Sequence, residues 1–256
     1  IFPDLAAIQR QFHHLIRTVP SQGLIIKNQE PVSLEEVIKQ GCWTPLETFG
    51  GATGDWQASS LTPDSSYFEV WYQGQRQGEV KWNLIGQHNI QNALAAIAGV
   101  RHAGVPVTQA CEALGTFKNV KRRLELRGVV KGVSVYDDFA HHPTAIAVTL
   151  EALRQRVGKQ YIIAVLEPRS NTMRMGVHQD TLAAALTQAN AVVLYQSDHL
   201  NWSLTTVTNS LHNARIFKNV DALIKHLVST ARSGDHILIM SNGDFQNIHQ
   251  RLLNEL

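Results

Sequence analysis

Two acids and two histidines lie close together in residues 137–143, in the order Asp137, Asp138, Phe139, Ala140, His141, His142 and Pro143. An apolar, strand-like run precedes them, and a helix-like segment follows. Carboxylates and imidazoles can bind metal ions, phosphates or ribose hydroxyls. Phosphorylated ligands usually bind α/β sheets where a strand ends and a helix begins. The motif therefore makes a nucleotide the first ligand to consider.

Other interpretations of this motif remain open. A metal-dependent phosphoesterase could use Asp137, Asp138, His141 and His142, because acids and histidines at this spacing occur in metallohydrolases. No H-x-H or H-E-x-x-H pattern occurs in the sequence, and we expect no resident metal site. A simpler interpretation is a turn in which one aspartate caps the next helix.

A second candidate site is the start of an alanine-rich helix at 88–104. Asn89 and Asn92 are three residues apart and would lie on one face of this helix, beside His88. Two carboxamides presented together can pair with the ring nitrogen and the exocyclic amine of a purine. Alternatively, Asn89 is only the helix N-cap and Asn92 a surface residue.

Three polar segments could also contact a ligand. Residues 121–123, Lys-Arg-Arg, lie in the best linker candidate, 116–123, where an arginine could bind phosphates. Residues 167–176 and 241–244 each follow an apolar, strand-like run, and the first contains two arginines suited to a carboxylate-rich molecule. A solvated charge run and plain connecting loops are the alternatives.

Composition narrows the possible classes of protein. The 256 residues carry a formal net charge of +2 with acids and bases interspersed, so nucleic-acid binding is not expected. No apolar run approaches the length of a membrane span. Cys42 and Cys111 are far apart and form no C-x-x-C pair, which favours a reducing cytoplasm. Neither G-x-x-x-x-G-K-S/T nor G-x-G-x-x-G occurs, and the glycines at 50–54 are expected to form a turn.

The predicted elements describe two different α/β regions. In the first region we expect a strand at 24–26. We also expect helices at 3–19, at 107–114 and after a capping box at 33–36. Strand-like stretches at 45–49, 55–61, 66–73 and 78–83 indicate a β-meander. In the second, strands at 124–130, 132–136, 160–166, 190–196 and 236–241 alternate with helices at 143–157, 179–189 and 219–233. This alternation predicts a mostly parallel, doubly wound sheet.

Taken in order, the segments 86–93, 122–124 and 137–144 resemble motifs of the muramyl ligases, the ATP-dependent amino-acid and peptide ligases of peptidoglycan assembly. Within that family, 167–176 and 240–243 are most similar to ligases that join the recycled tripeptide L-alanyl-γ-D-glutamyl-meso-diaminopimelate to UDP-N-acetylmuramate. The resemblance implies a partial central ATPase domain at 1–120, followed by a Rossmann-like C-terminal domain at 121–256. It also implies that the phosphate loop, the Mg²⁺ ligands and the UDP-binding domain lie upstream of Ile1, in a missing N-terminal half.

The resemblance also assigns roles to residues. Asn89 and Asn92 would face the adenine of ATP beside His88, Arg123 would bind its phosphates, and Asp138 the ribose and phosphate region, with His141 and His142 nearby. The peptide pocket would be lined by Arg169, Asn171, Arg174, Ser241, Asn242 and Gly243. After the Ser-Asn-Gly motif the family is usually glycine-rich, whereas this chain has Asp244, Gln246 and Asn247.

Such ligases use ATP and Mg²⁺ to convert a carboxylate into an acyl phosphate, which an amine then attacks. ATP would lie between the two domains, so that their closure excludes water. The expected protein is cytoplasmic and its substrates are UDP-N-acetylmuramate and the murein tripeptide. The chain alone is expected to be inactive. A non-catalytic nucleotide- or peptide-binding module is the third alternative.

Overall fold

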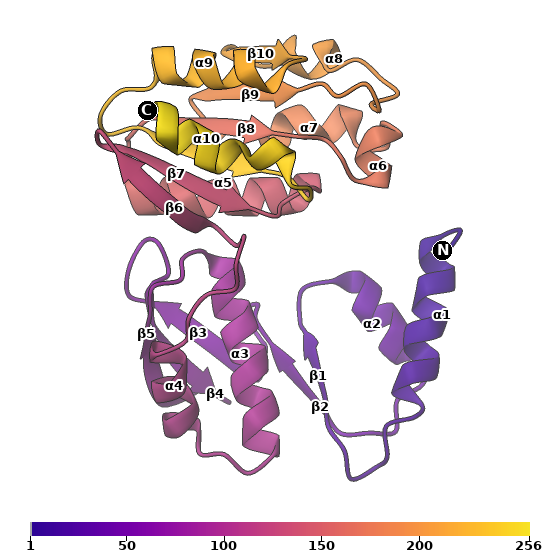
Figure 1. Cartoon of the computed structure of the whole chain (residues 1–256). Helices are drawn as coiled ribbons and strands as arrows, with labels where there is room; N and C mark the ends of the chain where they lie inside the picture. The colour runs from indigo at the N-terminus through magenta and orange to yellow at the C-terminus, as the bar shows by residue number, and fades with distance from the viewer. Residues whose placement is uncertain (1) are drawn as a thin grey trace. The chain divides into compact units, whose positions relative to one another are not determined.

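The computed structural model describes residues 2–256, so that only Ile1 lies outside it. The chain divides into two compact units, residues 1–118 and 119–256 (Figure 1). Among residues 2–256, no helix is long and apolar enough to cross a membrane.

The first unit is a five-stranded mixed sheet with helices packed beside it. The strands follow the chain in the order β1-β2-β3-β4-β5. The β1-β2 and β2-β3 pairs are parallel, whereas β3, β4 and β5 form an antiparallel meander. The strands are β1 (Ile25–Asn28), β2 (Leu46–Phe49), β3 (Trp56–Ser60), β4 (Tyr67–Tyr72) and β5 (Gln75–Lys81). The helices are α1 (Leu5–Ile16), α2 (Val32–Lys39), α3 (Gln87–His102) and α4 (Val107–Gly115).

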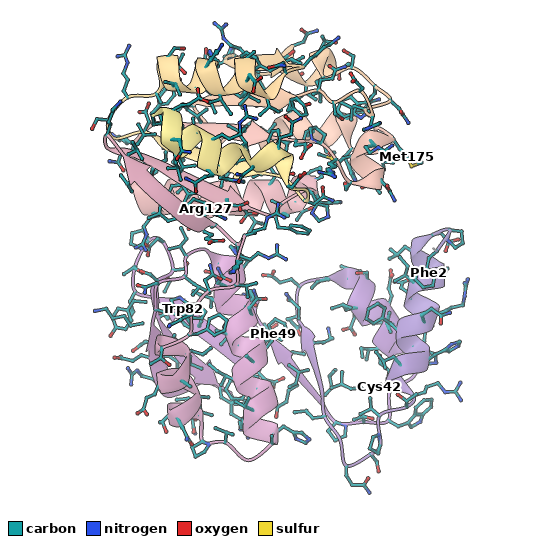
Figure 2. The ribbon with its side chains drawn as sticks, in the orientation of Figure 1. Phe2, Cys42, Phe49, Trp82, Arg127 and Met175 are labelled. Atoms are coloured by element: carbon teal, nitrogen blue, oxygen red, sulfur yellow. The ribbon has the colours of Figure 1, made fainter. Side chains whose placement is uncertain are left out.

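One apolar core holds this unit together, between the sheet and the helices α3 and α4. Trp56, Phe68 and Val80 of the sheet pack against Ile90 and Leu94 of α3. Phe49 and Trp82 belong to the same cluster and lie beside α3 in Figure 2. The first part of the unit lies outside this core, because Leu5, Ile8, Phe12 and Leu15 of α1 are exposed.

Two local expectations for the first unit are wrong. Helix α2 begins at Val32 and its N-cap position is Pro31, so Ser33 lies inside the helix and no side chain caps it. A proline at the cap position fixes the entry of the chain, and the capping box does not form. The strand expected at 24–26 starts one residue later, and its side chains are only half-buried except for Lys27.

The second unit is a six-stranded sheet in the order β10-β9-β8-β11-β7-β6 (Figure 1). All neighbouring pairs are parallel except β6-β7. The strands are β6 (Glu125–Val130), β7 (Val133–Asp138), β8 (Ile162–Leu166), β9 (Ala191–Tyr195), β10 (Ala214–Phe217) and β11 (His236–Met240). The helices are α5 (Pro143–Val157), α6 (Asn171–Arg174), α7 (Gln179–Ala185), α8 (Thr205–Thr208), α9 (Val220–Thr230) and α10 (Ile248–Glu255), with a 3₁₀ turn at Phe245–Asn247.

Helices cover both faces of this sheet. Ile146, Leu150 and Leu153 of α5 belong to the core on one face, together with residues of α6, α7 and α8. Helices α9 and α10 supply the core on the other face. Every residue of β8 and β11 is buried, as expected for the central strands of a parallel sheet. The doubly wound α/β fold predicted for this part of the chain is therefore confirmed.

The sequence did not predict β10, α6, α8 or α10. Strand β10 is four residues long and lies at the edge of the sheet, where a short half-buried run carries little periodic signal. Helix α10 follows three residues with positive φ, Phe245, Gln246 and Asn247. No usual helix-start pattern marks such a beginning.

Candidate functional site

The carboxyl ends of β7, β8 and β11 lie side by side in the second unit. Met240 at the end of β11 pairs with Asp138 of β7 and with Leu166 of β8. The loops that follow these strands therefore start at the same edge of the sheet. These loops carry most of the residues that the sequence singled out, at the place where α/β sheets usually bind ligands.

Asp138 is buried, and backbone N–H groups occupy both of its carboxylate oxygens. Oδ2 accepts a hydrogen bond of 2.6 Å from the amide of Leu124, and Oδ1 one of 2.7 Å from the amide of Ala140. Burial raises the pKa of Asp138, although these two hydrogen bonds and the nearby Arg123 act in the opposite direction. Asp138 thus connects the segment before β6 to the turn that follows β7.

Asp137 is also buried but points to the opposite face of the sheet, because side chains alternate along a strand. Its Oδ1 lies 3.4 Å from Nε of Arg122 and 3.3 Å from Nε2 of His249, and its Oδ2 lies 3.4 Å from Nη1 of Arg127. Burial alone would raise the pKa of Asp137, but His249 and Arg122 more than offset it, and the pKa is lowered.

The two histidines of the motif also face different partners. Nδ1 of His141 is 2.8 Å from the carbonyl of Phe139, whereas Nδ1 of His142 accepts a hydrogen bond from the amide of Thr144 and caps α5. The helix cap is thus a histidine, not an aspartate. The ring of His142 packs edge-on against His178, with ring centroids 4.4 Å apart. Burial, and then His142, lower the pKa of His178.

These orientations bear on the metal interpretation. The four side chains do not converge on one position where a metal ion could bind. Each has its own set of neighbours, namely those described above for Asp137, Asp138, His141 and His142. Across residues 2–256, no group of three or more histidines, cysteines and acids could hold a metal ion. The geometry therefore gives no support to a phosphoesterase that uses these four side chains.

A hydrogen bond and an ion pair join the loop after β11 to the loop after β8. Oγ of Ser241 donates a hydrogen bond of 2.5 Å to Oε2 of the buried Glu167 and accepts one from the amide of Gly243. Nη1 of Arg169 lies 3.0 Å from Oδ1 of Asp244, whose pKa this contact lowers. Arg169 and the Ser241 loop, both expected near a peptide, are thus neighbours.

Gly243 has a steric role in this arrangement. A Cβ atom at this position would lie 1.9 Å from Nη1 of Arg169, so the guanidinium packs directly on the glycine. Next to it, Oδ1 of Asn242 is buried without a hydrogen-bond partner among the described residues. A buried, unpaired acceptor is costly, which makes this oxygen a candidate to accept a hydrogen bond from a ligand.

The remaining residues of the expected peptide pocket are less closely connected to this loop. Asn171 is exposed at the start of α6. Nε of Arg174 donates to the carbonyl of His199, so this arginine is tied to the segment after β9. Met175 follows α6, is 70% exposed and projects outward (Figure 2).

Arg122 and Arg123 point to different surroundings. Nη2 of Arg122 donates to the carbonyls of Ser241 and Gly243, over 2.5 and 2.7 Å. Arg123 is exposed, with its guanidinium carbon 5.8 Å from the centre of the Phe139 ring. Arg123 is therefore the arginine of this pair that is accessible to a ligand.

In the first unit, the start of α3 presents Asn89 and Asn92 as expected, but the two side chains bond to each other. Nδ2 of Asn92 lies 3.4 Å from Oδ1 of Asn89, and Nδ2 of Asn89 donates to the carbonyl of Ile85. The N-cap position is Gly86, so Asn89 is not the N-cap. His88 is half-buried at the second position of the helix. Asn92 remains exposed.

Sequence reasoning gave no individual role to several residues of the edge and missed two of them, His178 and His249. Glu167, His178, Asp244 and His249 all contact residues of the candidate site. Glu167 and Asp244 belong to the segments 167–176 and 241–244 that the sequence singled out after predicted strands, but neither was assigned a role of its own. His178 and His249 carry no local signal, because their partners lie far away in the sequence.

Comparison with known proteins agrees with this architecture. Residues 1–100 match the family described as Mur ligase middle domain, and residues 122–243 match the Mur ligase, glutamate ligase domain. A UDP-N-acetylmuramate--L-alanyl-gamma-D-glutamyl-meso-2,6-diaminoheptandioate ligase of Haemophilus influenzae is 50% identical over all of this chain, and the Escherichia coli protein of the same name is 53% identical. The chain spans 57% and 56% of the length of these relatives.

A solved structure also covers the whole chain. The crystal structure of a murein peptide ligase from Psychrobacter arcticus 273-4 has 43% sequence identity and a TM-score of 0.72 over 100% of this chain, which covers 55% of that protein. The two family matches account for most of the chain, in the order expected from the motifs. The chain belongs to the Mur ligase family, of which it contains a middle and a C-terminal domain region.

Proposed function

We propose that this chain is the C-terminal part of an ATP-dependent ligase that joins L-alanyl-γ-D-glutamyl-meso-diaminopimelate to UDP-N-acetylmuramate. The observation that carries the proposal is the 50% and 53% identity, over the entire chain, to two relatives that are named for this reaction. The sequence contains no G-x-x-x-x-G-K-S/T phosphate loop. We therefore propose that the chain by itself does not ligate.

The chemistry explains why ATP is required. A carboxylate does not condense with an amine in water, so the γ-phosphoryl group of ATP is first transferred to the carboxylate of UDP-N-acetylmuramate, which releases ADP. The amine of the tripeptide then attacks the acyl phosphate, and an amide and phosphate are formed as the amine loses a proton. Negative charge develops on phosphoryl oxygens during the first step, where a positioned arginine stabilises it.

The residues present suit parts of this reaction. We assign phosphate contact to Arg123, the exposed arginine of the 121–123 segment, and adenine contact to Asn89 and Asn92 beside His88. Asp138 is proposed for the ribose and phosphate region. Asp138 also accepts a hydrogen bond from the amide of Leu124, and this bond helps to hold the adjacent residue Arg123 in place. His141 and His142 follow Asp138 in the same motif, three and four residues later.

The peptide is assigned to the edge formed by the loops after β8 and β11. A tripeptide ending in diaminopimelate carries several carboxylates and two amino groups, those of the alanine and of the distal end of diaminopimelate. Arg169 offers a planar fork for a carboxylate, and the unpaired Oδ1 of Asn242 offers an acceptor for an N–H group. Ser241 and Gly243 shape this loop, and Asn171 and Arg174 flank it.

Mg²⁺ is expected for phosphoryl transfer, but its ligands are not found in this part of the protein. Among the described residues, no group of three or more histidines, cysteines and acids could hold a metal ion. We therefore assign no Mg²⁺ ligand in this chain.

The proposal is tested by comparing the 256-residue chain with the longer polypeptide that contains it. Each would be incubated with ATP, Mg²⁺, UDP-N-acetylmuramate and either the tripeptide or L-alanine, and products would be identified by mass spectrometry. We expect the UDP-N-acetylmuramyl tripeptide from the longer protein only. Ligation by the chain alone, or a clear preference of the longer protein for L-alanine, would contradict the proposal.

A matched pair of variants sharpens this test in the longer protein. Arg169→Gln removes the proposed carboxylate fork, and Arg215→Gln removes an exposed arginine of β10 as the control. Loss of a charged hydrogen bond to a ligand costs roughly 1.5–3 kcal/mol, which corresponds to a rise in the KM for the tripeptide of about tenfold or more. The control should leave this KM unchanged.

A further inference from the structure

Arg122 is enclosed by the candidate peptide edge although its neighbour Arg123 is exposed. Its Nη2 donates to two backbone carbonyls of one loop, those of Ser241 at 2.5 Å and Gly243 at 2.7 Å. Its Nε lies 3.4 Å from Oδ1 of Asp137, and its guanidinium carbon is 5.1 Å from the centre of the Phe139 ring. One side chain thus joins the segment before β6, the end of β7 and the loop after β11.

The backbone of Arg122 is held in a conformation that orients this side chain. Its φ is +59°, in the left-handed region that costs a non-glycine residue roughly 1–2 kcal/mol. Three hydrogen bonds fix the segment. The amide of Arg122 donates to Oε2 of Glu125, its carbonyl accepts from the amide of Phe139, and the amide of Leu124 donates to Asp138. These hydrogen bonds therefore hold the backbone of Arg122 in its left-handed conformation.

The charge of Arg122 is balanced where it is partly buried. Asp137 lies between Arg122 and Arg127 and also faces His249. A guanidinium can reach two carbonyls and a carboxylate at once because its donors form a planar fork, whereas a lysine ammonium is a compact charge on a flexible stem. The site is thus built for arginine in particular.

Holding the Ser241–Gly243 backbone has a consequence for Arg169. The guanidinium of Arg169 packs directly on Gly243, and it bonds to Asp244, the next residue. A shift of this loop would therefore move the support on which Arg169 lies. Gly243 thus lies between the two arginines, because it accepts a hydrogen bond from Arg122 and is in contact with Arg169, the proposed carboxylate-binding residue.

We propose that Arg122 is a positioning residue that fixes the loop 241–243, and through it Arg169, for binding of the peptide substrate. Arg122 touches neither ATP nor peptide. Its role differs from that of Arg123, which is assigned to phosphate. The identity of the peptide rests on the proposed function, but the clamping of the loop by Arg122 does not.

The first experiment measures the clamp without any activity. Hydrogen exchange of backbone amides would be followed in the 256-residue chain and in its variants Arg122→Met, Arg122→Lys and, as the matched control, Arg123→Met. Because charged hydrogen bonds to two carbonyls are removed, we expect the exchange of the Gly243 amide to rise about tenfold or more in the Arg122 variants. The Arg123 variant should stay within about twofold of the parent, since the Arg123 side chain is exposed and its described contact is with the Phe139 ring instead of the loop 241–243.

Exchange in the central strand β8 separates a local effect from general destabilisation. The amides of Ala164 and Val165 should keep their protection in Arg122→Lys, the conservative variant that decides the question if Arg122→Met does not fold. Unchanged exchange at Gly243 in that variant would overturn the proposal. An equal rise in β8 would also overturn it, because it would reveal a purely structural role.

The second experiment uses the longer ligase and separates the substrates. We expect Arg122→Lys to raise the KM for the tripeptide about tenfold, while the KM for ATP changes less than about twofold. Arg123→Lys should show the opposite pattern, with its effect on ATP. A fall in kcat with an unchanged tripeptide KM would overturn the proposal for Arg122. If the longer protein ligates no tripeptide at all, the proposed function fails while the exchange result still decides the clamp.

Discussion

The two units organise their candidate ligand residues in different ways. At the start of α3, Asn92 bonds to Asn89 and Asn89 bonds to Ile85, over separations of three and four residues. At the sheet edge of the second unit, Arg122 bonds to Ser241 and Gly243, over separations of 119 and 121 residues. One site is built from a single turn of chain and the other from segments that only the complete sheet brings together.

The cores of the two units show the same contrast. The first unit has one core, between the sheet and the helices α3 and α4, and leaves the apolar side chains of α1 exposed. The second has a core on each face of its sheet, so its central strands are buried throughout. A site tied into such a sheet should be sensitive to the loss of a buried connection, whereas a site on one helix should be less so.

The largest effect is expected for Asp138→Ala in the second unit. The change leaves the buried amide of Ala140 and the half-buried amide of Leu124 without their acceptor. Because each unsatisfied buried donor costs roughly 1–3 kcal/mol, we expect the free energy of unfolding of this unit to fall by about 3 kcal/mol. This free energy can be measured by urea denaturation, with hydrogen exchange of the β8 amides as the probe of the second unit. Asp198→Ala, at an exposed aspartate, is the control, and an equal effect of both would remove the contrast.

A smaller effect is expected for Glu47→Gln in the first unit. Glu47 accepts hydrogen bonds from Trp56 at 2.7 Å and from Tyr72 and Arg101 at 3.1 Å, and it ties the sheet to the end of α3. Since the amide keeps one acceptor, we expect a loss of about 1–2 kcal/mol. Tryptophan fluorescence during urea denaturation is suitable, because four of the five tryptophans lie in this unit.

Glu112→Gln, at an exposed position of α4, is the control for Glu47. Protection of the β8 amides should be unchanged in both variants. If Glu47→Gln lowered protection in β8 as much as in β3, the two units would unfold as one, and the comparison between them would lose its basis.

The smallest effect is expected for Asp244→Asn. The hydrogen bond from Arg169 lowers the pKa of Asp244, so any stabilisation by this pair is present above the ordinary pKa of the carboxyl, 3.8, and disappears as the pH falls through the lowered value. Both side chains are well exposed, and exposed pairs contribute little. We expect no measurable change in the urea midpoint at pH 7. A shift as large as that of Glu47→Gln would show that this loop is stabilised by its surface pair instead of by Arg122.

Local patterns in the sequence were sufficient for much of the fold. The alternation of apolar runs with helical segments predicted the doubly wound sheet of the second unit. The turn-rich region predicted a meander, which β3, β4 and β5 form, although the stretch at 45–49 does not belong to it because β2 pairs in parallel. Local patterns failed where a neighbour in space decided the outcome. The parallel pairing of β1, β2 and β3 had no signal in the sequence, and Pro31 replaced Ser33 at the start of α2.

For the candidate site, the sequence alone determined which segments carry polar residues at strand ends and at a helix start, because strand and helix periodicity can be read over a few residues. Only the tertiary structure decided what each side chain faces. Asp137 and Asp138 are adjacent in the chain but point to opposite faces of the sheet, and Arg122 is bonded to the loop after β11 while its neighbour Arg123 is exposed. Parallel strands are joined by long crossovers, so some partners, such as Ser241 and Gly243 for Arg122 and His249 for Asp137, lie more than a hundred residues away, beyond the reach of any local pattern.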